Sequence, residues 1–280
     1  MRIITDSAAD FTNEELKTFD VECVRTQVMI GNKSYTPGID LTESAFWNGL
    51  LSGEDVKTSQ PSPDAFLKIF ENIKEKGEEA VYISISSALS GTLQSARIAA
   101  SMLSYDKLHI VDSLNGAAGQ KLLVMHACRL RDEGKALAGE IVSKLNEVKK
   151  RIRLFASLDT LDNLARSGRI SKTVASIGTL AKIKPLLTVS EDGRIVMTGK
   201  ALGRHRAIES LAKRIAAIKI DREHPVIPLY SYDDTNCRAL VEKLKTLGVQ
   251  TDEALKSAIG TAIAPHIGPG AYGAAFVTAE

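Results

Sequence analysis

The chain has 280 residues, of which 44% are hydrophobic and 25% are charged, a composition typical of globular proteins. Lys and Arg number 36 against 34 Asp and Glu, so the net charge of +2 argues against a nucleic-acid-binding face over the whole surface. Aromatic residues make up only 5% and do not interleave with a basic run, which argues against a platform for stacked bases.

The first strand is expected at Arg2–Ile4, so the amino terminus has the pattern of a folded domain and not of a signal peptide. No apolar run reaches the roughly 18 residues that a membrane-spanning helix needs, and we expect no stable membrane insertion. Cys23, Cys128 and Cys237 are widely spaced, which indicates reduced thiols and a cytoplasmic location.

The first half of the chain alternates strands with helices. A helix opened by a capping box of Thr12 and Glu15 follows the first strand, and a second helix begins at Pro63 with Ser62 as its cap. A hairpin is expected around Gly31 and Asn32. The further predicted elements are a helix at Ser44–Leu51, strands at Ala80–Ile85 and Lys107–Val111, and helices at Thr92–Leu103 and Gly116–Glu133. This alternation predicts a parallel α/β sheet with ligand-binding loops at the carboxyl ends of its strands.

The pattern changes near residue 152, where we place the boundary between domains 1–152 and 153–280. A strand at Ile152–Leu158 and a hairpin around Glu191–Gly193 are expected in the second domain. The other predicted elements are helices at Leu158–Leu164, Val174–Ala181, Ala207–Ile218 and Asn236–Leu247, and strands at Val226–Tyr232, Ala262–Pro265 and Gly273–Val277.

Two hydroxyl-rich stretches stand at helix starts, where backbone N–H groups lack partners and carry partial positive charge. In the first half, Thr58 and Ser59 precede the helix that begins at Pro63. Ser90, Gly91 and Thr92 follow the strand Ala80–Ile85 and open the next helix. Both stretches suit an anion, but ordinary helix capping explains each of them equally well when it is taken alone.

A third candidate stretch lies near the carboxyl terminus. His266 begins a loop in which Gly268 and Gly270 flank a proline, a pattern that predicts a fixed turn with inward-facing N–H groups. Its imidazole is able to donate to a carboxylate. A structural histidine is the alternative interpretation.

Basic residues supply possible contacts for an acidic group or partner. Arg169 lies in a turn together with Arg166 and Lys172, and a guanidinium group holds planar oxyanions well. A second basic edge contains Lys200, Arg204 and Arg206. A solvated surface is the simpler interpretation of this edge, and a docking surface is the alternative.

Several motifs of common enzymes are missing from the sequence, among them the P-loop, the dinucleotide-binding glycine pattern and the nucleophile elbow. No histidine, cysteine and carboxylate cluster has the spacing of metal ligands, so we expect neither a metal nor a cofactor. The residues favour a site that holds an acidic head group. The alternative is a metabolic enzyme for a small carboxylated or phosphorylated substrate, with His266 as general acid or base.

The candidate stretches, taken in order, resemble the DegV family, the fatty-acid-binding subunits that work with a bacterial fatty acid kinase. The matching segments run over nearly the whole chain: Ile4–Ser7, Thr58–Ser62, Ser86–Thr92, Val111–Ser113, Leu161–Ser171, Lys184–Leu187 and His266–Gly273. Two segments depart from the family pattern, namely Leu114–Ala117 and the surroundings of Leu202 and Gly203.

The resemblance implies an α/β fold of two domains, the first with a parallel sheet and the second with a mixed sheet, that enclose a long acyl chain between them. It implies that Thr58 and Ser90 hold the fatty acid carboxylate, that His266 joins them and that Arg169 lies nearby. It also implies a carrier without catalytic residues. A separate ATP-binding kinase would phosphorylate the lipid for phospholipid synthesis.

Overall fold

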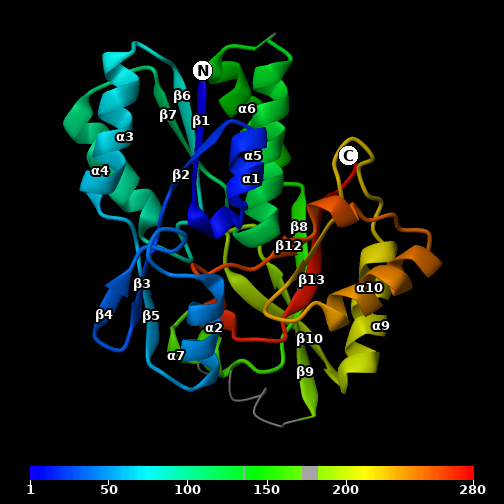
Figure 1. The fold of residues 1–280 in the computed structure, drawn as a ribbon. Coiled ribbons are helices and arrows are strands. Elements are labelled where there is room, and N and C mark those ends of the chain that lie inside the picture. Colours follow the sequence, from blue (N-terminus) through cyan, green and yellow to red (C-terminus); the bar gives the residue numbers. More distant parts are fainter. Residues whose placement is uncertain (135, 172–181) are drawn as a thin grey trace.

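The computed structural model describes residues 1–134, 136–171 and 182–280 (Figure 1). Four parallel strands in the order β2-β1-β6-β7 form the sheet of the amino-terminal half. These strands are β1 (Arg2–Asp6), β2 (Val21–Val24), β6 (Ala80–Ser84) and β7 (Leu108–Asp112). The accompanying helices are η1 (Ser7–Ala9), α1 (Asn13–Thr18), α3 (Pro63–Glu75), α4 (Thr92–Leu103), α5 (Ala117–Asp132) and α6 (Ala138–Val148). The predicted parallel α/β sheet is confirmed.

The predicted helix caps at Thr12 and Ser62 are confirmed. The hydroxyl oxygen of Thr12 accepts a hydrogen bond from the N–H of Glu15 at 3.1 Å, and the carboxylate of Glu15 accepts one from the N–H of Thr12 at 2.8 Å. Ser62 caps α3 by accepting from the N–H of Ala65 at 3.3 Å. Side-chain oxygens therefore satisfy N–H groups that a helix start leaves unpaired.

A small antiparallel sheet stands beside the parallel one, in the order β4-β3-β5. It consists of β3 (Gln27–Ile30), β4 (Lys33–Tyr35) and β5 (Val56–Ser59), and helix α2 (Glu43–Leu51) joins β4 to β5. The hairpin of β3 and β4 was predicted. Strand β5 was not, because its four residues include only one strongly apolar side chain. Thr58 lies on β5 and pairs with Val28 of β3.

The carboxyl-terminal half contains a six-stranded mixed sheet in the order β10-β9-β8-β13-β11-β12, in which only the last pair is parallel. Its strands are β8 (Ile152–Ser157), β9 (Ile183–Val189), β10 (Ile195–Leu202), β11 (Ile227–Tyr230), β12 (Ser257–Ala258) and β13 (Tyr272–Val277). The helices of this half are α7 (Asp162–Arg166), α9 (Arg204–Ala216), α10 (Thr235–Thr246), η2 (Glu253–Leu255) and α11 (Ala264–Ile267). Helices α9 and α10 cover one face of the sheet (Figure 1).

Two sequence predictions for this half were wrong. The segment Ala262–Pro265 was expected to be a strand, but it leads into helix α11. Pro265 occupies the first turn of that helix, a position where its missing N–H costs nothing. The helix expected from Leu158 begins only at Asp162, because the N–H of Leu158 still bonds to Pro185 of the neighbouring strand. The helix expected at Val174–Ala181 lies outside the described residues.

The largest hydrophobic core surrounds helix α5. Leu122, Leu123 and Val124 of this helix are almost fully buried. They belong to one cluster with Val81 of the parallel sheet and Val277 of the mixed sheet. Residue 152, where we expected the domain boundary, is the first residue of β8, and the buried cluster extends across it.

Candidate functional site

A polar cavity of about 310 Å³ lies where the three hydroxyl- and glycine-rich stretches meet. Ser59 and Gly91 in its wall are exposed, so the cavity reaches the surface. Its polar lining comes from loops, helix ends and strand β5, and includes residues of both halves of the chain. The lining residues include Thr26, Thr58, Ser59, Gln60, Ser90, Gly91, Thr92, Arg169 and His266.

Thr58 and His266 meet in this cavity although 208 positions separate them in the sequence. The Oγ1 atom of Thr58 lies 2.8 Å from Nε2 of His266, a hydrogen-bond distance. Strand β5 carries Thr58 and helix α11 carries His266. The hydrogen bond therefore joins the small antiparallel sheet to the carboxyl-terminal half.

Ser90 stands in front of helix α4 in the wall of the same cavity. Its hydroxyl lies 2.8 Å from the hydroxyl of Thr92 and accepts a hydrogen bond from the N–H of Thr92 at 3.3 Å. The side chain of Gln60 lies over Gly91 between them, so that a Cβ atom there would lie 2.1 Å from Oε1 and would displace this amide. This start of a twelve-residue helix thus combines hydroxyls with the positive end of the helix dipole.

Arg169 brings a positive charge to the cavity. Its Nε donates to the carbonyl of Leu89 at 3.3 Å, and its Nη1 donates to the carbonyl of Ser167. Burial lowers the pKa of His266 to about 4, and the charge of Arg169 adds to this effect. His266 is therefore neutral at pH 7. Within the described part of the chain, its Nδ1 is buried without a hydrogen-bond partner.

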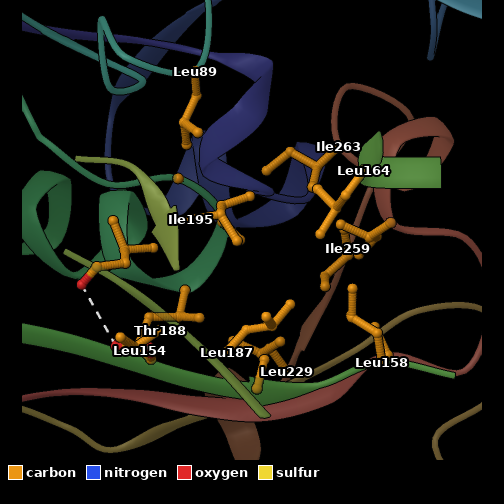
Figure 2. Close-up of a pocket in the computed structure, with 16 residues that line it drawn as sticks. Leu89, Leu154, Leu158, Leu164, Leu187, Thr188, Ile195, Leu229, Ile259 and Ile263 are labelled. Atoms are coloured by element: carbon orange, nitrogen blue, oxygen red, sulfur yellow. Dashed lines mark hydrogen bonds between the residues drawn. The ribbon is translucent and has the colours of Figure 1, made fainter. Parts of the chain in front are cut away.

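A second cavity, of about 90 Å³, lies next to the polar one and shares part of its wall. Figure 2 shows its side chains pointing inward from β8, β9, β11 and the segments around them. Thr188 is the one labelled residue with a hydroxyl group (Figure 2). This hydroxyl donates a hydrogen bond to the carbonyl of Leu154 at 2.8 Å and therefore has no hydrogen left to donate to a ligand. The residues that line both cavities are Leu89, Leu164, Ile195, Ile263 and Ile267. The larger cavity carries the polar groups, and the smaller cavity is lined almost entirely by apolar side chains.

Sequence reasoning missed most of this apolar lining, and it also missed Gln60. The Nε2 of Gln60 donates to Ser95 at 3.0 Å, and its side chain covers Gly91. Gln60 lies within the hydroxyl-rich stretch Thr58–Ser62, so its amide could have been predicted from the sequence as part of the site. The apolar residues gave no signal, because a leucine that faces a cavity has the same sequence pattern as one that packs in a core.

Gly268 and Gly270 shape the turn after His266 but do not line either cavity. Both have a backbone φ in the left-handed region that favours glycine, at 74° and 80°. The N–H of Gly268 bonds to the carbonyl of Ala264, and that of Gly270 bonds to the carbonyl of Ser231. These two N–H groups are therefore engaged within the protein.

The described basic residues proposed for docking differ in their surroundings. Arg204 pairs with Asp159 at 2.9 Å, and Arg166 donates to Asn163. Lys200 and Arg206 are exposed, and Arg206 borders a groove on the outer side of α9. Lys172 lies outside the described residues.

Two absences among the described residues bear on the type of site. Within these residues, no three His, Cys, Asp or Glu side chains are grouped so that they would hold a metal ion. No helix among them is long and apolar enough to cross a bilayer.

Comparison with known proteins places the chain in a family. The model described as "Uncharacterised protein, DegV family" matches residues 1–279. A DegV domain-containing protein from Caldanaerobacter subterraneus is 32% identical over 274 residues, which are 98% of this chain and 97% of the relative.

Solved structures of similar fold cover nearly the whole chain. One from Thermus thermophilus, described as showing fatty acid binding of a DegV family protein, is 30% identical with a TM-score of 0.88 and covers 100% of both chains. A stearic-acid-binding protein from Eubacterium ventriosum is 26% identical with a TM-score of 0.89, and the match covers 99% of this chain and 98% of that one. The chain described here belongs to the DegV family.

Proposed function

We propose that the protein binds a long-chain fatty acid, with the carboxylate at the polar groups of the larger cavity and the acyl chain running along the apolar walls of that cavity toward the smaller, apolar one. The observation that carries this proposal is that a polar and an apolar cavity lie side by side and share the wall residues Leu89, Ile195 and Ile263. Fatty acids have this division into one charged end and a long apolar remainder. The fatty acids bound by solved members of the family support the same ligand class.

The two ends of the ligand would contribute differently to affinity. Burial of a methylene group is worth about 0.8 kcal/mol, so about fifteen of them sum to roughly 12 kcal/mol before the costs of binding. Hydrogen bonds from Thr58, Ser90 and His266 would add about 1–3 kcal/mol each. Chain burial therefore supplies most of the affinity, and the polar cluster fixes the direction in which the ligand lies.

The positive charge of Arg169 and the dipole of α4 support a carboxylate at the polar end. A carboxylate in a half-buried site stays ionised only if several donors face it. Thr58, Ser90 and Thr92 offer hydroxyls, and His266 offers a ring nitrogen. Ser90 and Thr92 follow the carboxyl end of strand β6 in the parallel sheet, the edge where such folds bind ligands.

The protein then acts as a carrier, and a separate ATP-dependent kinase phosphorylates the carboxylate. The exposure of Ser59 and Gly91 beside the polar end supports this division, because it leaves the head group within reach of a second protein. The family resemblance seen in the sequence implies the same division. Arg204, Arg206 and Lys200 are candidates for contact with that partner.

Organic extraction of the purified protein followed by mass spectrometry tests the ligand. We expect about one long-chain acid per protein, and uptake of added palmitate or oleate by the emptied protein. The absence of both would overturn the proposal. Adding ATP and a fatty acid kinase tests the carrier role, with loaded protein lacking ATP as the control. Conversion of a small acid by the protein alone, abolished in His266→Ala, would show an enzyme instead.

A further inference from the structure

The hydrogen bond between Thr58 and His266 joins strand β5 to helix α11. One dipeptide contacts the surroundings of both elements. This dipeptide is Ser231-Tyr232, which follows strand β11. Neither residue lines the polar or the apolar cavity. The role of the dipeptide rests on the proposed function, because it concerns how the carboxylate end of that site is kept in place.

Ser231 is fully buried and ties together the turn that follows His266. Its hydroxyl donates to the carbonyl of Gly268 at 2.8 Å and accepts from the N–H of Ala271 at 2.9 Å. Its own N–H donates to the carbonyl of Ala271 at 3.0 Å, and its carbonyl accepts from the N–H of Gly270 at 3.2 Å. One residue thus bonds to both ends of the turn and fixes the carboxyl end of α11, where His266 lies.

Tyr232 reaches in the opposite direction, toward the small antiparallel sheet. Its ring centroid lies 5.2 Å from that of Trp47 on helix α2. Trp47 belongs to a buried cluster with Val28, the residue paired with Thr58, and with Ala264 of α11. The ring of Tyr232, which is 54% exposed, therefore packs against the layer that carries Thr58.

The backbone of Tyr232 adopts a conformation that is unusual for a tyrosine. Its φ is 66°, in the left-handed region that a residue with a bulky side chain rarely adopts. The bonds of Ser231 on one side and the packing on Trp47 on the other hold this conformation. Such outliers are kept where the surrounding structure over-determines them, often beside a functional site.

We propose that Ser231 and Tyr232 form a positioning clip: Ser231 fixes the turn that carries His266, and Tyr232 fixes the layer that carries Thr58. The clip keeps the two side chains hydrogen-bonded before the ligand arrives. Pre-organisation of this kind removes an ordering cost from binding.

Tyr232→Gly tests the clip, with Tyr232→Phe as its matched control. The glycine variant removes the ring but relieves the left-handed backbone, so we expect its stability to urea to be kept while its affinity for a fluorescent C16 fatty acid falls about tenfold. Imidazole NMR signals of His266 in the ligand-free protein should shift. Tyr232→Phe keeps the ring and should match the wild type in all three measurements. Unchanged affinity and unchanged His266 signals in Tyr232→Gly would overturn the proposal.

Ser231→Ala gives an independent test when it is combined with Thr58→Ala. If Ser231 acts through the Thr58–His266 hydrogen bond, its loss weakens fatty acid binding in the wild type but adds little in protein that already lacks the Thr58 hydroxyl. Full additivity of the two losses would contradict the proposal. Because the His266 signals are recorded without ligand, they test the clip even if the wild type binds no fatty acid, a result that would overturn only the proposed function.

Discussion

The polar and the apolar cavity are built in different ways. The polar one collects side chains from a strand end, a helix start, a turn and a short helix, and hydrogen bonds such as that between Thr58 and His266 hold these pieces together. The apolar one is lined mainly by strands of the mixed sheet and segments that pack on it, with few polar atoms (Figure 2). The polar end therefore depends on the placement of each group, whereas the apolar end depends on volume.

This difference suggests that the two ends can be disturbed separately. Filling the apolar space should remove affinity without affecting the direction of the ligand. Deleting a polar group should weaken the affinity for fatty acids of every chain length by the same factor. Single substitutions at each end test whether the two contributions are independent.

The largest effect is expected where the two cavities meet. Ile195→Trp places a large ring in the wall that both cavities share, so we expect palmitate affinity to fall about 100-fold, or roughly 3 kcal/mol. Displacement of a fluorescent fatty acid measures it. Ile98→Trp is the control, because Ile98 is 41% exposed on α4. Equal affinities of the two variants would show that the acyl chain does not pass Ile195.

Removing a head-group contact should cost less. Thr58→Ala deletes the hydroxyl that bonds His266, and we expect affinity to fall about tenfold, or roughly 1.4 kcal/mol. The factor should be the same for C14 and C18 acids, and a titration series of chain lengths checks it. Ser87→Ala serves as the control, since Ser87 is an exposed serine in the loop before Ser90. A loss that grows with chain length would break the proposed separation of the two ends.

The titration of His266 should report whether a carboxylate binds beside it. Its pKa is lowered from 6.5 to about 4, so it contributes stability above pH 6.5 that is lost as the pH falls toward 4. A bound carboxylate should raise this pKa by about one unit, because opposite charge favours the imidazolium. NMR titration with and without palmitate measures the change. His126, whose pKa burial also lowers to about 4, lies outside both cavities and should not respond.

The smallest effect on affinity is expected at Ser62. The stretch Thr58–Ser62 has two roles, ligand binding by Thr58 and helix capping by Ser62, and this substitution separates them. Ser62 caps helix α3, so Ser62→Ala should lower the free energy of unfolding by about 1 kcal/mol in urea titrations. Its affinity for palmitate should stay at the wild-type value. Loss of affinity comparable to that of Thr58→Ala would mean that capping and ligand binding cannot be separated here.

Local sequence patterns were enough to predict much of the fold and the polar residues of the site. Caps at Thr12 and Ser62 mark helix starts because a side-chain oxygen must replace missing backbone partners there. Hydroxyls and glycines at Ser90 and His266 marked loops that suit an anion, and the structure brings Thr58 and His266 into contact. That contact required a fold in which distant loops meet, and the family resemblance supplied this expectation.

Other features left no local trace. Strand β5 is short and is fixed by its pairing with β3, so its own residues did not reveal it. The apolar cavity is a space that packing leaves empty, and the composition of its walls is that of any core. Ser231 looks like an ordinary serine until its hydrogen bonds to a distant turn are known.

Helix α5 is buried along most of its length, and this burial governs how the molecule can be divided. The helix packs on strands of the parallel sheet and on β8, β11 and β13 of the mixed sheet. A fragment ending at residue 152 would present one side of this helix to water, and the complementary fragment would lose the cover of its sheet. We therefore expect the two pieces to be unstable when made separately and to regain structure only when mixed.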